Sequence, residues 1–249
     1  MNAILITGCS SGFGLETARY FQDRDWNVVA TMRKPQDVGL PLSPRLRILP
    51  LDVTDPASIE RIVREAGPIN ALVNNAGIGW LNALEGTPMN VARDVFETNT
   101  LGTLAMTQAF MPQFRERRAG VIVNVTSSVT LKSLPLLSVY TASKAAVNAF
   151  TECFALELQP SDVRVCLVLP GQAMETSFGA NARVRLQEEG GFHPAYVDQA
   201  AAIIAGWQAD QSVKTTSNDV AEAVWRAVTD ANAPMRIPAG ADAIALVTG

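Results

Sequence analysis

The stretch YTASK places Tyr140 and Lys144 four residues apart. On a helix this spacing puts both side chains on one face. A tyrosine with its ordinary pKa of about 10 is a poor acid–base catalyst at neutral pH. A neighbouring ammonium group favours the phenolate, so we expect Lys144 to lower the pKa of Tyr140 toward a catalytic range. Taken alone such a pair is more often structural, but it predicts a reaction in which a proton moves.

A second candidate group lies in NVTSSVT (124–130), which ends an apolar run. Open α/β sheets carry their ligands at the carboxyl ends of the strands. A hydroxyl at this point could therefore hold the oxygen of a substrate carbonyl. Neighbouring residues on a strand face opposite sides, so the residues alone leave open whether Ser127 or Ser128 faces the site.

The stretch TGCSSGFG (7–14) follows the apolar run AILI and precedes a helical pattern. Its glycines let the backbone approach a pyrophosphate, and the following helix directs free N–H groups at the anion. An ordinary strand-to-helix turn would explain one or two of these glycines. The spacing G-x-x-x-G-x-G is longer at its first gap than the usual dinucleotide fingerprint, but it predicts the same kind of site.

The end of the second apolar run, ATMRKP, bears on the choice of cofactor. A carboxylate there would accept hydrogen bonds from a ribose 2′-hydroxyl, whereas an arginine pairs with a 2′-phosphate. The run ends in Met32, Arg33 and Lys34 without a carboxylate. We therefore expect NADP(H), with a cation of this pair on the phosphate and Ser10 or Ser11 able to help. A solvated pair of surface cations is the alternative.

Short apolar runs and amphipathic stretches alternate along the chain and would position these groups. We expect strands at 3–8, 27–32, 47–53, 70–77, 121–127 and 164–171, and an edge strand at 235–240. We expect helices at 14–23, 56–65, 88–117, 141–158 and 217–230, with Asp55 and Ser217 as N-caps. The alternation predicts an α/β fold, a Rossmann-type doubly wound parallel sheet of about seven strands with helices on both faces.

Two segments interrupt this alternation. The segment 34–45 holds three prolines, so we expect a loop there in place of a crossover helix. The helical pattern loosens over 177–199, where we expect a mobile flap, and it returns only at 217–230. We place the substrate flap at about 177–215. Because no Gly/Ser-rich linker divides the chain, we expect a single domain over 1–249.

Five motifs, in this order, resemble those of the short-chain dehydrogenases/reductases. They are TGCSSGFG (7–14), LDV (51–53), NNAG (74–77), NTLG (99–102) and YTASK (140–144). The resemblance covers residues 3–171 and is closest to the NADP-preferring hydroxysteroid and retinol dehydrogenase-like and carbonyl reductase branch. It implies a Rossmann fold, a nicotinamide cofactor and an active site for carbonyl or alcohol substrates.

The resemblance also implies residue roles. It selects Ser127, thirteen residues before Tyr140, to orient the carbonyl oxygen. Tyr140 would protonate that oxygen, and Lys144 would also contact the nicotinamide ribose. Asn99 would bend its helix and hold a water that relays protons to Lys144. The expected cofactor-binding residues are Gly8, Ser10, Ser11, Gly12, Phe13, Gly14, Arg33, Asp52, Val53, Asn75, Ala76, Gly77, Tyr140, Lys144, Pro170 and Gly171.

Two residues remain unassigned. The family usually has a threonine three residues beyond the glycine of its PG motif, whereas here four residues separate Gly171 from Thr176. A contact between Thr176 and the nicotinamide therefore stays open. His193, the single histidine, has no assigned role.

Composition excludes several classes of function. The net charge of −4 argues against nucleic acid as a partner, and apolar runs are too short to span a membrane. One histidine and three cysteines without C-x-x-C spacing predict no metal site. The cysteine usage and the absence of a signal-peptide pattern indicate a cytoplasmic protein. The helix at 141–158 and the resemblance suggest a homodimer or homotetramer.

These observations predict an NADPH-dependent carbonyl reductase or alcohol dehydrogenase for an apolar small molecule. A 3-oxoacyl-thioester reductase is the alternative within enzymes, and it would be expected to carry a basic patch for its carrier. A non-catalytic NADP(H)-binding sensor or scaffold is the alternative outside enzymes. A methyltransferase would not need the Y-x-x-x-K pair and usually has an acidic residue after its second strand.

Overall fold

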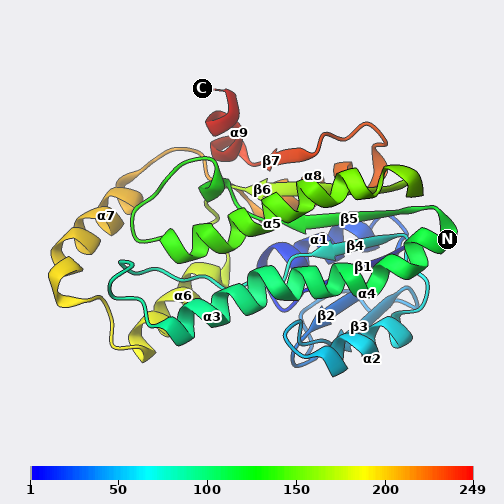
Figure 1. The fold of residues 1–249 in the computed structure, drawn as a ribbon, viewed down its shortest axis with the longest axis horizontal. Helices are drawn as coiled ribbons and strands as arrows, with labels where there is room; N and C mark the ends of the chain where they lie inside the picture. Colours follow the sequence, from blue (N-terminus) through cyan, green and yellow to red (C-terminus); the bar gives the residue numbers. More distant parts are fainter. Residues whose placement is uncertain (1, 249) are drawn as a thin grey trace.

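Seven parallel strands form one continuous sheet at the centre of the molecule (Figure 1). The computed structural model describes residues 2–248. The strand order is β3-β2-β1-β4-β5-β6-β7, and every neighbouring pair is parallel. The strands are β1 (Ala3–Ile6), β2 (Asn27–Met32), β3 (Leu46–Pro50), β4 (Ala71–Asn74), β5 (Gly120–Val125), β6 (Val163–Pro170) and β7 (Arg236–Ala239). The predicted fold class is confirmed, and β7 is the expected edge strand.

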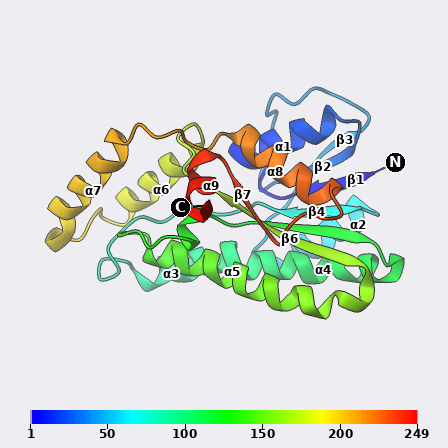
Figure 2. The same ribbon diagram turned by 90° about the horizontal axis from the view of Figure 1, so that it is seen from above.

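Helices cover both faces of this sheet (Figure 2). One face carries α1 (Gly12–Gln22) and α8 (Ser217–Thr229), which pack against each other. The opposite face carries α2 (Pro56–Ala66), α4 (Gly102–Arg117) and α5 (Ser138–Glu157). The chain order reverses between β1 and β4, and in such sheets ligands bind beyond the carboxyl ends of the strands at this point.

The alternation of side chains along the strands explains the two layers. Ile4 and Ile6 belong to the apolar cluster under α1 and α8, whereas Leu5 belongs to the cluster under α2 and α4. Successive strand residues face opposite sides of a sheet, so a strand covered on both faces must be apolar at almost every position. This is why the strands are near-continuous runs of Val, Ile and Leu.

Local signals set the ends of several elements. Within the described residues no helix joins β2 to β3, as the three prolines predicted. The Asp55 side chain accepts a hydrogen bond from the Ala57 N–H and caps α2, also as predicted. The prediction of Ser217 as a cap is wrong. Thr216 caps α8 because it exchanges hydrogen bonds with Asp219, three residues on, which completes a capping box.

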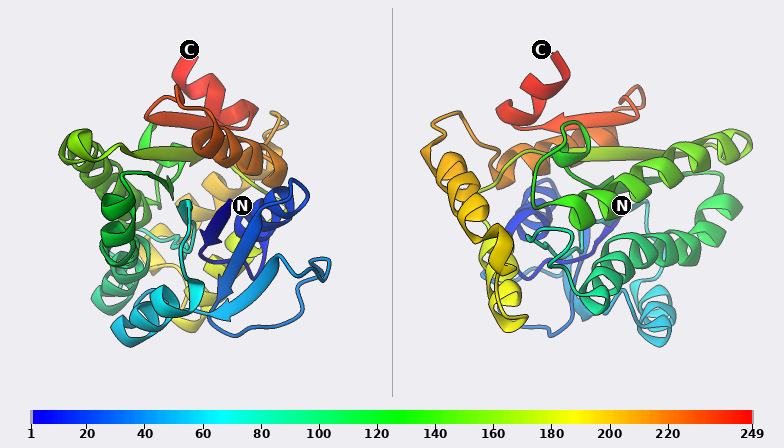
Figure 3. Two further views of the ribbon diagram at one scale, coloured as in Figure 1. Left: turned by 90° about the vertical axis from the view of Figure 1, so that its right-hand side faces the viewer. Right: turned by 60° about the vertical axis from the view of Figure 1, so that its left-hand side comes forward.

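The segment after β6 is helical, contrary to expectation. The helices α6 (Ser177–Glu188) and α7 (Val197–Ala209) lie beyond the end of the sheet, on the left in Figure 1, and are drawn in shades of yellow (Figures 1 and 3). Ala182 and Leu186 are the buried residues of α6, and Ala200 is that of α7. Helices that bury so little carry no broad apolar stripe, and the pattern therefore did not reveal them. The sequence analysis also missed α9 (Ala241–Thr248), which follows β7.

Candidate active site

The glycine loop between β1 and α1 is held open by a threonine and an asparagine. Gly8 and Gly12 have φ of +74° and +57°, where glycine is favoured. The Thr7 hydroxyl accepts hydrogen bonds from the N–H groups of Asn75 and Ala76, each at 2.9 Å. The Asn75 amide donates to the carbonyl oxygens of Thr7 at 2.9 Å and Gly8 at 3.2 Å. The Asn75 amide thus supports the loop, and a contact between Asn75 and a cofactor stays a prediction.

Gly14 tests whether this cradle tolerates a side chain. A Cβ on Gly14 would lie 2.4 Å from the Gly8 carbonyl oxygen and 2.5 Å from the Asn75 Nδ2. We expect Gly14→Ala to lower the free energy of unfolding by about 1–3 kcal/mol and to weaken dinucleotide binding, because the backbone must shift. Denaturant unfolding and cofactor titration measure both effects. Gly179→Ala, in α6 with no atom within 4 Å of its Cβ, is the control and should be neutral or slightly stabilising. A Gly14→Ala protein as stable as the control would contradict the expectation.

At the carboxyl ends of β2 and β3, Arg33 and Asp52 lie close together. Arg33 and Lys34 are exposed, whereas Met32 is buried at 3% exposure. Partial burial raises the pKa of Asp52, but hydrogen bonds from Thr54 and the charge of Arg33 outweigh it, and the pKa falls below its usual value. Val53 is buried, and its side chain would contact a Cβ on Gly102 at 2.8 Å. The structure therefore brings Arg33, Asp52 and Val53 to one edge, beside the glycine loop.

Tyr140 and Ser127 meet across the end of β5. Tyr140 lies in the first turn of α5, and the two residues are 7% and 8% exposed. Burial raises the pKa of Tyr140 to about 12, and the nearby Ser127 hydroxyl acts in the opposite direction. The expectation that Lys144 lowers the pKa of Tyr140 is therefore wrong for this chain, because desolvation dominates. At neutral pH the Tyr140 hydroxyl keeps its proton and can donate it.

Lys144 lies one turn further along α5 and is 5% exposed. Its Nζ donates a hydrogen bond to the Val125 carbonyl oxygen at 3.0 Å. Burial lowers the pKa of Lys144 to about 8. A Cβ on Gly77 would lie 3.3 Å from this Nζ and 3.1 Å from the Asn99 Oδ1, so the two side chains approach each other over a glycine.

Asn99 lies in a widened helical turn. The helix expected over 88–117 consists of α3 (Met89–Phe96), the π-helical turn η1 (Glu97–Leu101) and α4. Within η1 the fully buried Asn99 side chain accepts from the Ile78 N–H at 2.8 Å and donates to the Ile78 carbonyl oxygen at 3.0 Å. A π-turn of this kind interrupts the helix, often at functional sites. The relay of protons through a water on Asn99 stays a prediction.

Ser143 is a residue that the sequence analysis missed. Its hydroxyl accepts a hydrogen bond from the Asn99 Nδ2 at 3.0 Å and donates to the Tyr140 carbonyl oxygen at 2.7 Å. Ser143 is fully buried, and its two hydrogen bonds join the π-turn η1 to the first turn of α5. In the sequence, the one indication was its place between Tyr140 and Lys144 in YTASK. Its bonds to Asn99 and to the Tyr140 carbonyl oxygen become visible only in the folded structure.

The lowered pKa of Lys144 predicts a pH dependence of stability. The folded lysine loses its proton near pH 8, whereas the unfolded one keeps it to about pH 10.5. The unfolded state thus binds more protons between these values, and stability rises with pH there, by up to about 1.4 kcal/mol per pH unit. We expect the free energy of unfolding of the natural protein minus that of Lys144→Met to rise from pH 8 to 10. Burial raises the pKa values of Cys9 and Tyr140, each to about 12, and their contributions cancel because both proteins contain these residues. A flat difference would refute the expectation.

The chain leaves β6 at Pro170 and Gly171 and enters the segment 172–214. Hydrogen bonds among Gly171, Gln172, Thr215 and Asp242, here called the clamp, join the two ends of this segment. The Gly171 N–H donates to the Thr215 hydroxyl at 3.0 Å, and the Gln172 N–H donates to the Asp242 Oδ2 at 2.6 Å. The Thr215 N–H in turn donates to the Gln172 carbonyl oxygen at 3.1 Å. Both ends of the segment 172–214 therefore meet at one point, which α9 secures through Asp242. Thr176 lies near the glycine loop, 3.3 Å from a Cβ on Gly12.

An apolar side chain of α6 lies beside Tyr140, and further apolar clusters join the loop after β4 to the segment that follows α6. The Phe178 ring lies 5.6 Å from the Tyr140 ring, centre to centre, and would be 2.8 Å from a Cβ on Gly79. Phe192 packs in the clusters that contain Trp80 and Leu136. His193 touches the same loop at Gly86 and stacks edge-on with Tyr196.

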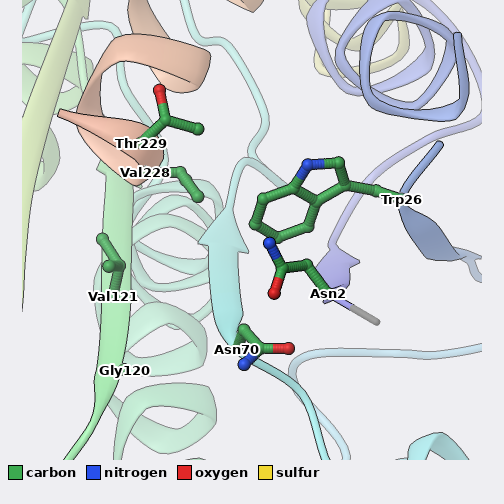
Figure 4. A pocket seen from close by; sticks show the side chains of 7 residues that line it. All are labelled: Asn2, Trp26, Asn70, Gly120, Val121, Val228 and Thr229. Atoms are coloured by element: carbon green, nitrogen blue, oxygen red, sulfur yellow. The ribbon is translucent and has the colours of Figure 1, made fainter. Parts of the chain in front are cut away.

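Other hollows of the molecule lie away from these groups. One of about 370 Å³ is lined by Asn2, Trp26, Asn70, Gly120, Val121, Val228 and Thr229 (Figure 4). It lies at the amino ends of the strands, opposite the glycine loop, and carries no charged side chain. Residues 2–248 contain no cluster of three or more metal-ligating side chains. No helix among them has the length and apolar character that a bilayer span requires.

Comparison with known proteins decides the family. Residues 2–186 match the family model described as short chain dehydrogenase. The chain belongs to the short-chain dehydrogenase family. It is thus an oxidoreductase of a family that uses a nicotinamide cofactor, and the convergence of Ser127, Tyr140, Lys144 and Asn99 forms its candidate active site.

Similar members of the family differ in their named substrates and cofactors. A 3-ketodihydrosphingosine reductase of Bacteroides thetaiotaomicron is 33% identical over 242 residues, which cover 95% of this chain and 87% of that protein. Retinol dehydrogenase 8 of Bos taurus is 31% identical over 249 residues, which cover 94% of this chain and 80% of that protein.

Two similar solved structures contain different nicotinamide cofactors, so they do not decide between NAD and NADP for this chain. A serine dehydrogenase complexed with NADP⁺ superposes with a TM-score of 0.81 at 28% identity. The match covers 96% of this chain and 94% of the serine dehydrogenase chain. A Burkholderia phymatum short-chain dehydrogenase in complex with NAD has a TM-score of 0.80 at 26% identity, with 95% and 88% covered.

Proposed function

We propose that the protein is an NADPH-dependent carbonyl reductase, acting also in reverse as an alcohol dehydrogenase, on an apolar small molecule. The observation that carries the reaction is the placement of the buried Ser127, after β5, near the buried Tyr140, with Lys144 one turn away on the same helix. Ser127 orients the carbonyl oxygen, Tyr140 donates a proton to it, and Lys144 returns the proton. When bound, the nicotinamide supplies the hydride.

The pKa values describe the resting protonation states of the two residues at neutral pH. Tyr140, with its pKa raised to about 12 by burial, carries its proton. Lys144, with its pKa lowered to about 8, carries its proton below pH 8 and releases it more readily than an exposed lysine does. Because a catalyst leaves the equilibrium between carbonyl and alcohol unchanged, these values favour neither direction of the reaction.

The residues around the cofactor fit an NADP(H) molecule. The glycine cradle excludes side chains at Gly8 and Gly14, and α1 begins at Gly12 with its free N–H groups toward the loop. The exposed Arg33 at the end of β2 provides a cation for a 2′-phosphate, and no carboxylate follows β2 directly. Gly8, Ser10, Ser11, Gly12, Phe13 and Gly14 would hold the pyrophosphate. Asp52, Val53, Asn75, Ala76 and Gly77 would line the adenosine and ribose side, and Tyr140, Lys144, Pro170 and Gly171 the nicotinamide side.

The apolar surroundings of Tyr140 support an apolar substrate. The Phe178 ring lies beside Tyr140, and Phe178 also approaches Gly79 in the loop after β4. The two relatives above are named for 3-ketodihydrosphingosine and retinol, which are both largely hydrocarbon. We also propose a single domain with a substrate flap at about 177–215, a cytoplasmic location, and a homodimer or homotetramer, whose mass sedimentation would measure.

The experiment is a titration of the purified protein with NADPH and NADH, followed by turnover on a panel of ketones and aldehydes. Tighter NADPH binding with loss of NADPH absorbance in the presence of a carbonyl is the expected result. Binding without turnover on any carbonyl would favour the sensor. A preference for NADH would overturn the cofactor assignment and leave the family intact.

A further inference from the structure

The turn that carries Ser127 is tied to α5 by side chains to which the proposed reaction gives no role. Ser127 caps the short 3₁₀ turn η2 (Ser128–Thr130). The Thr130 hydroxyl donates to the Ser127 carbonyl oxygen at 2.8 Å, and the Asn148 Nδ2 donates to that hydroxyl at 3.0 Å. Two hydrogen bonds in series thus join α5 to the backbone of Ser127.

Asn148 shares its helix with the two groups that act on protons. It follows Lys144 by four residues and Tyr140 by eight, so the three side chains follow one face of α5. On the same face the Thr151 hydroxyl accepts from the Asn124 Nδ2 of β5 at 2.8 Å. Together with the Lys144 bond to Val125, these contacts set α5 on β5. Asn148 alone among them reaches the turn of Ser127.

The amide at position 148 is not explained by stability. Asn148 is 6% exposed, and among the described residues its Oδ1 has no hydrogen-bond partner. An unpaired buried polar atom costs about 1–3 kcal/mol. A leucine would avoid this cost beside the neighbouring Val147. Residues that break a local rule of packing tend to lie at functional sites.

We propose that Asn148 and Thr130 are positioning residues that hold Ser127 at its working distance from Tyr140. The proposal rests on the proposed function, in which Ser127 orients the substrate oxygen. Since Tyr140 and Ser127 come from different elements, only a link between those elements can fix their separation. A displacement of about 1 Å in such a group can lower a rate about a hundredfold.

The test is a comparison of Thr130→Val with Thr130→Ser. Valine keeps the shape of the side chain and loses both hydrogen bonds, whereas serine keeps the hydroxyl. We expect Thr130→Val to lower kcat about tenfold to a hundredfold at unchanged NADPH affinity, and Thr130→Ser to stay within about twofold of the natural protein. Asn148→Leu removes the same link from the helix side and should lower kcat likewise. If Thr130→Val does not fold, Asn148→Leu replaces it as the variant in which the link is broken.

A double-mutant cycle separates positioning from general damage. If Thr130 acts through Ser127, Thr130→Val has no further effect on kcat once Ser127→Ala is present. An equal loss in the natural and Ser127→Ala backgrounds would overturn the proposal, and so would an equal loss for Thr130→Ser and Thr130→Val.

Thr151→Val is the matched control, because it removes another buried hydroxyl from the same face of α5. It should lower thermal stability and leave kcat within about twofold. If it lowers kcat as much as Thr130→Val does, the link to Ser127 is not specific and the proposal fails. The natural protein is assayed first. Its inactivity on every carbonyl would overturn the proposed function, whereas an active natural protein with an unaffected Thr130→Val would overturn this inference alone.

Discussion

Tyr140→Phe is expected to lower kcat by about a hundredfold to ten-thousandfold, the range in which a positioned acid contributes. The substitution removes only the hydroxyl, and Tyr140 is buried, with the Phe178 ring 5.6 Å away. A phenylalanine therefore keeps the packing and removes only the group that would donate the proton. NADPH affinity and the thermal midpoint should change little. Turnover on the best carbonyl of the panel and a fluorescence titration measure these quantities.

Tyr20→Phe provides the comparison for Tyr140→Phe. Tyr20 lies on α1, and its ring stacks under the Arg24 guanidinium, far from the reacting groups. This variant should keep full turnover. Turnover retained in Tyr140→Phe at the natural level would remove the tyrosine from the mechanism, and a fall shared by both variants would indicate a loss of folded protein.

Arg33→Gln is expected to raise the Kd for NADPH by about tenfold to a hundredfold and to leave the Kd for NADH nearly unchanged. A hydrogen bond to a charged group contributes about 1.5–3 kcal/mol, and about 1.4 kcal/mol corresponds to a factor of ten. Arg33 is exposed beside Asp52, so its removal leaves no buried charge. Titrations of both cofactors at one ionic strength give the two constants.

Lys34→Gln separates a direct contact from the general field of two cations. Lys34 is the exposed neighbour of Arg33 and carries the same charge. Its loss should change the Kd for NADPH by no more than about a few fold, because exposed charges at a distance are screened by salt. Equal effects of the two variants would mean that neither residue binds the phosphate specifically.

The sequence predicted the sheet well because its signals there are local and redundant. Most strands are buried on both faces and therefore largely apolar, and the capping Asp55 with the following proline marks α2 directly. The glycine loop was visible because Gly8 and Gly12 have a positive φ that favours glycine, and a Cβ on Gly8 or Gly14 would lie too close to neighbouring atoms. Glycines at such positions can be recognised from a single sequence by their spacing.

The remainder depended on contacts that no local pattern encodes. The π-turn at Asn99 and the role of Ser143 arise from packing between α4, α5 and the loop after β4. The direction of the Tyr140 pKa was mispredicted because spacing shows a neighbouring charge but not the extent of burial. The helices α6 and α7 bury few residues, so their sequences lack the periodicity by which helices are recognised.

The clamp formed by Gly171, Gln172, Thr215 and Asp242 has a consequence for how such enzymes diversify. The chain leaves the sheet and returns to it at one point, where hydrogen bonds join the two ends of the excursion. The forty or so residues between these ends can therefore change in sequence and length while their points of attachment to the sheet stay in place. Within the segment, Phe178 packs beside Tyr140 and Gly79, so a replacement segment must provide an equivalent contact. We propose that exchanging this segment between relatives, with that contact kept, is a route to exchanging their substrates.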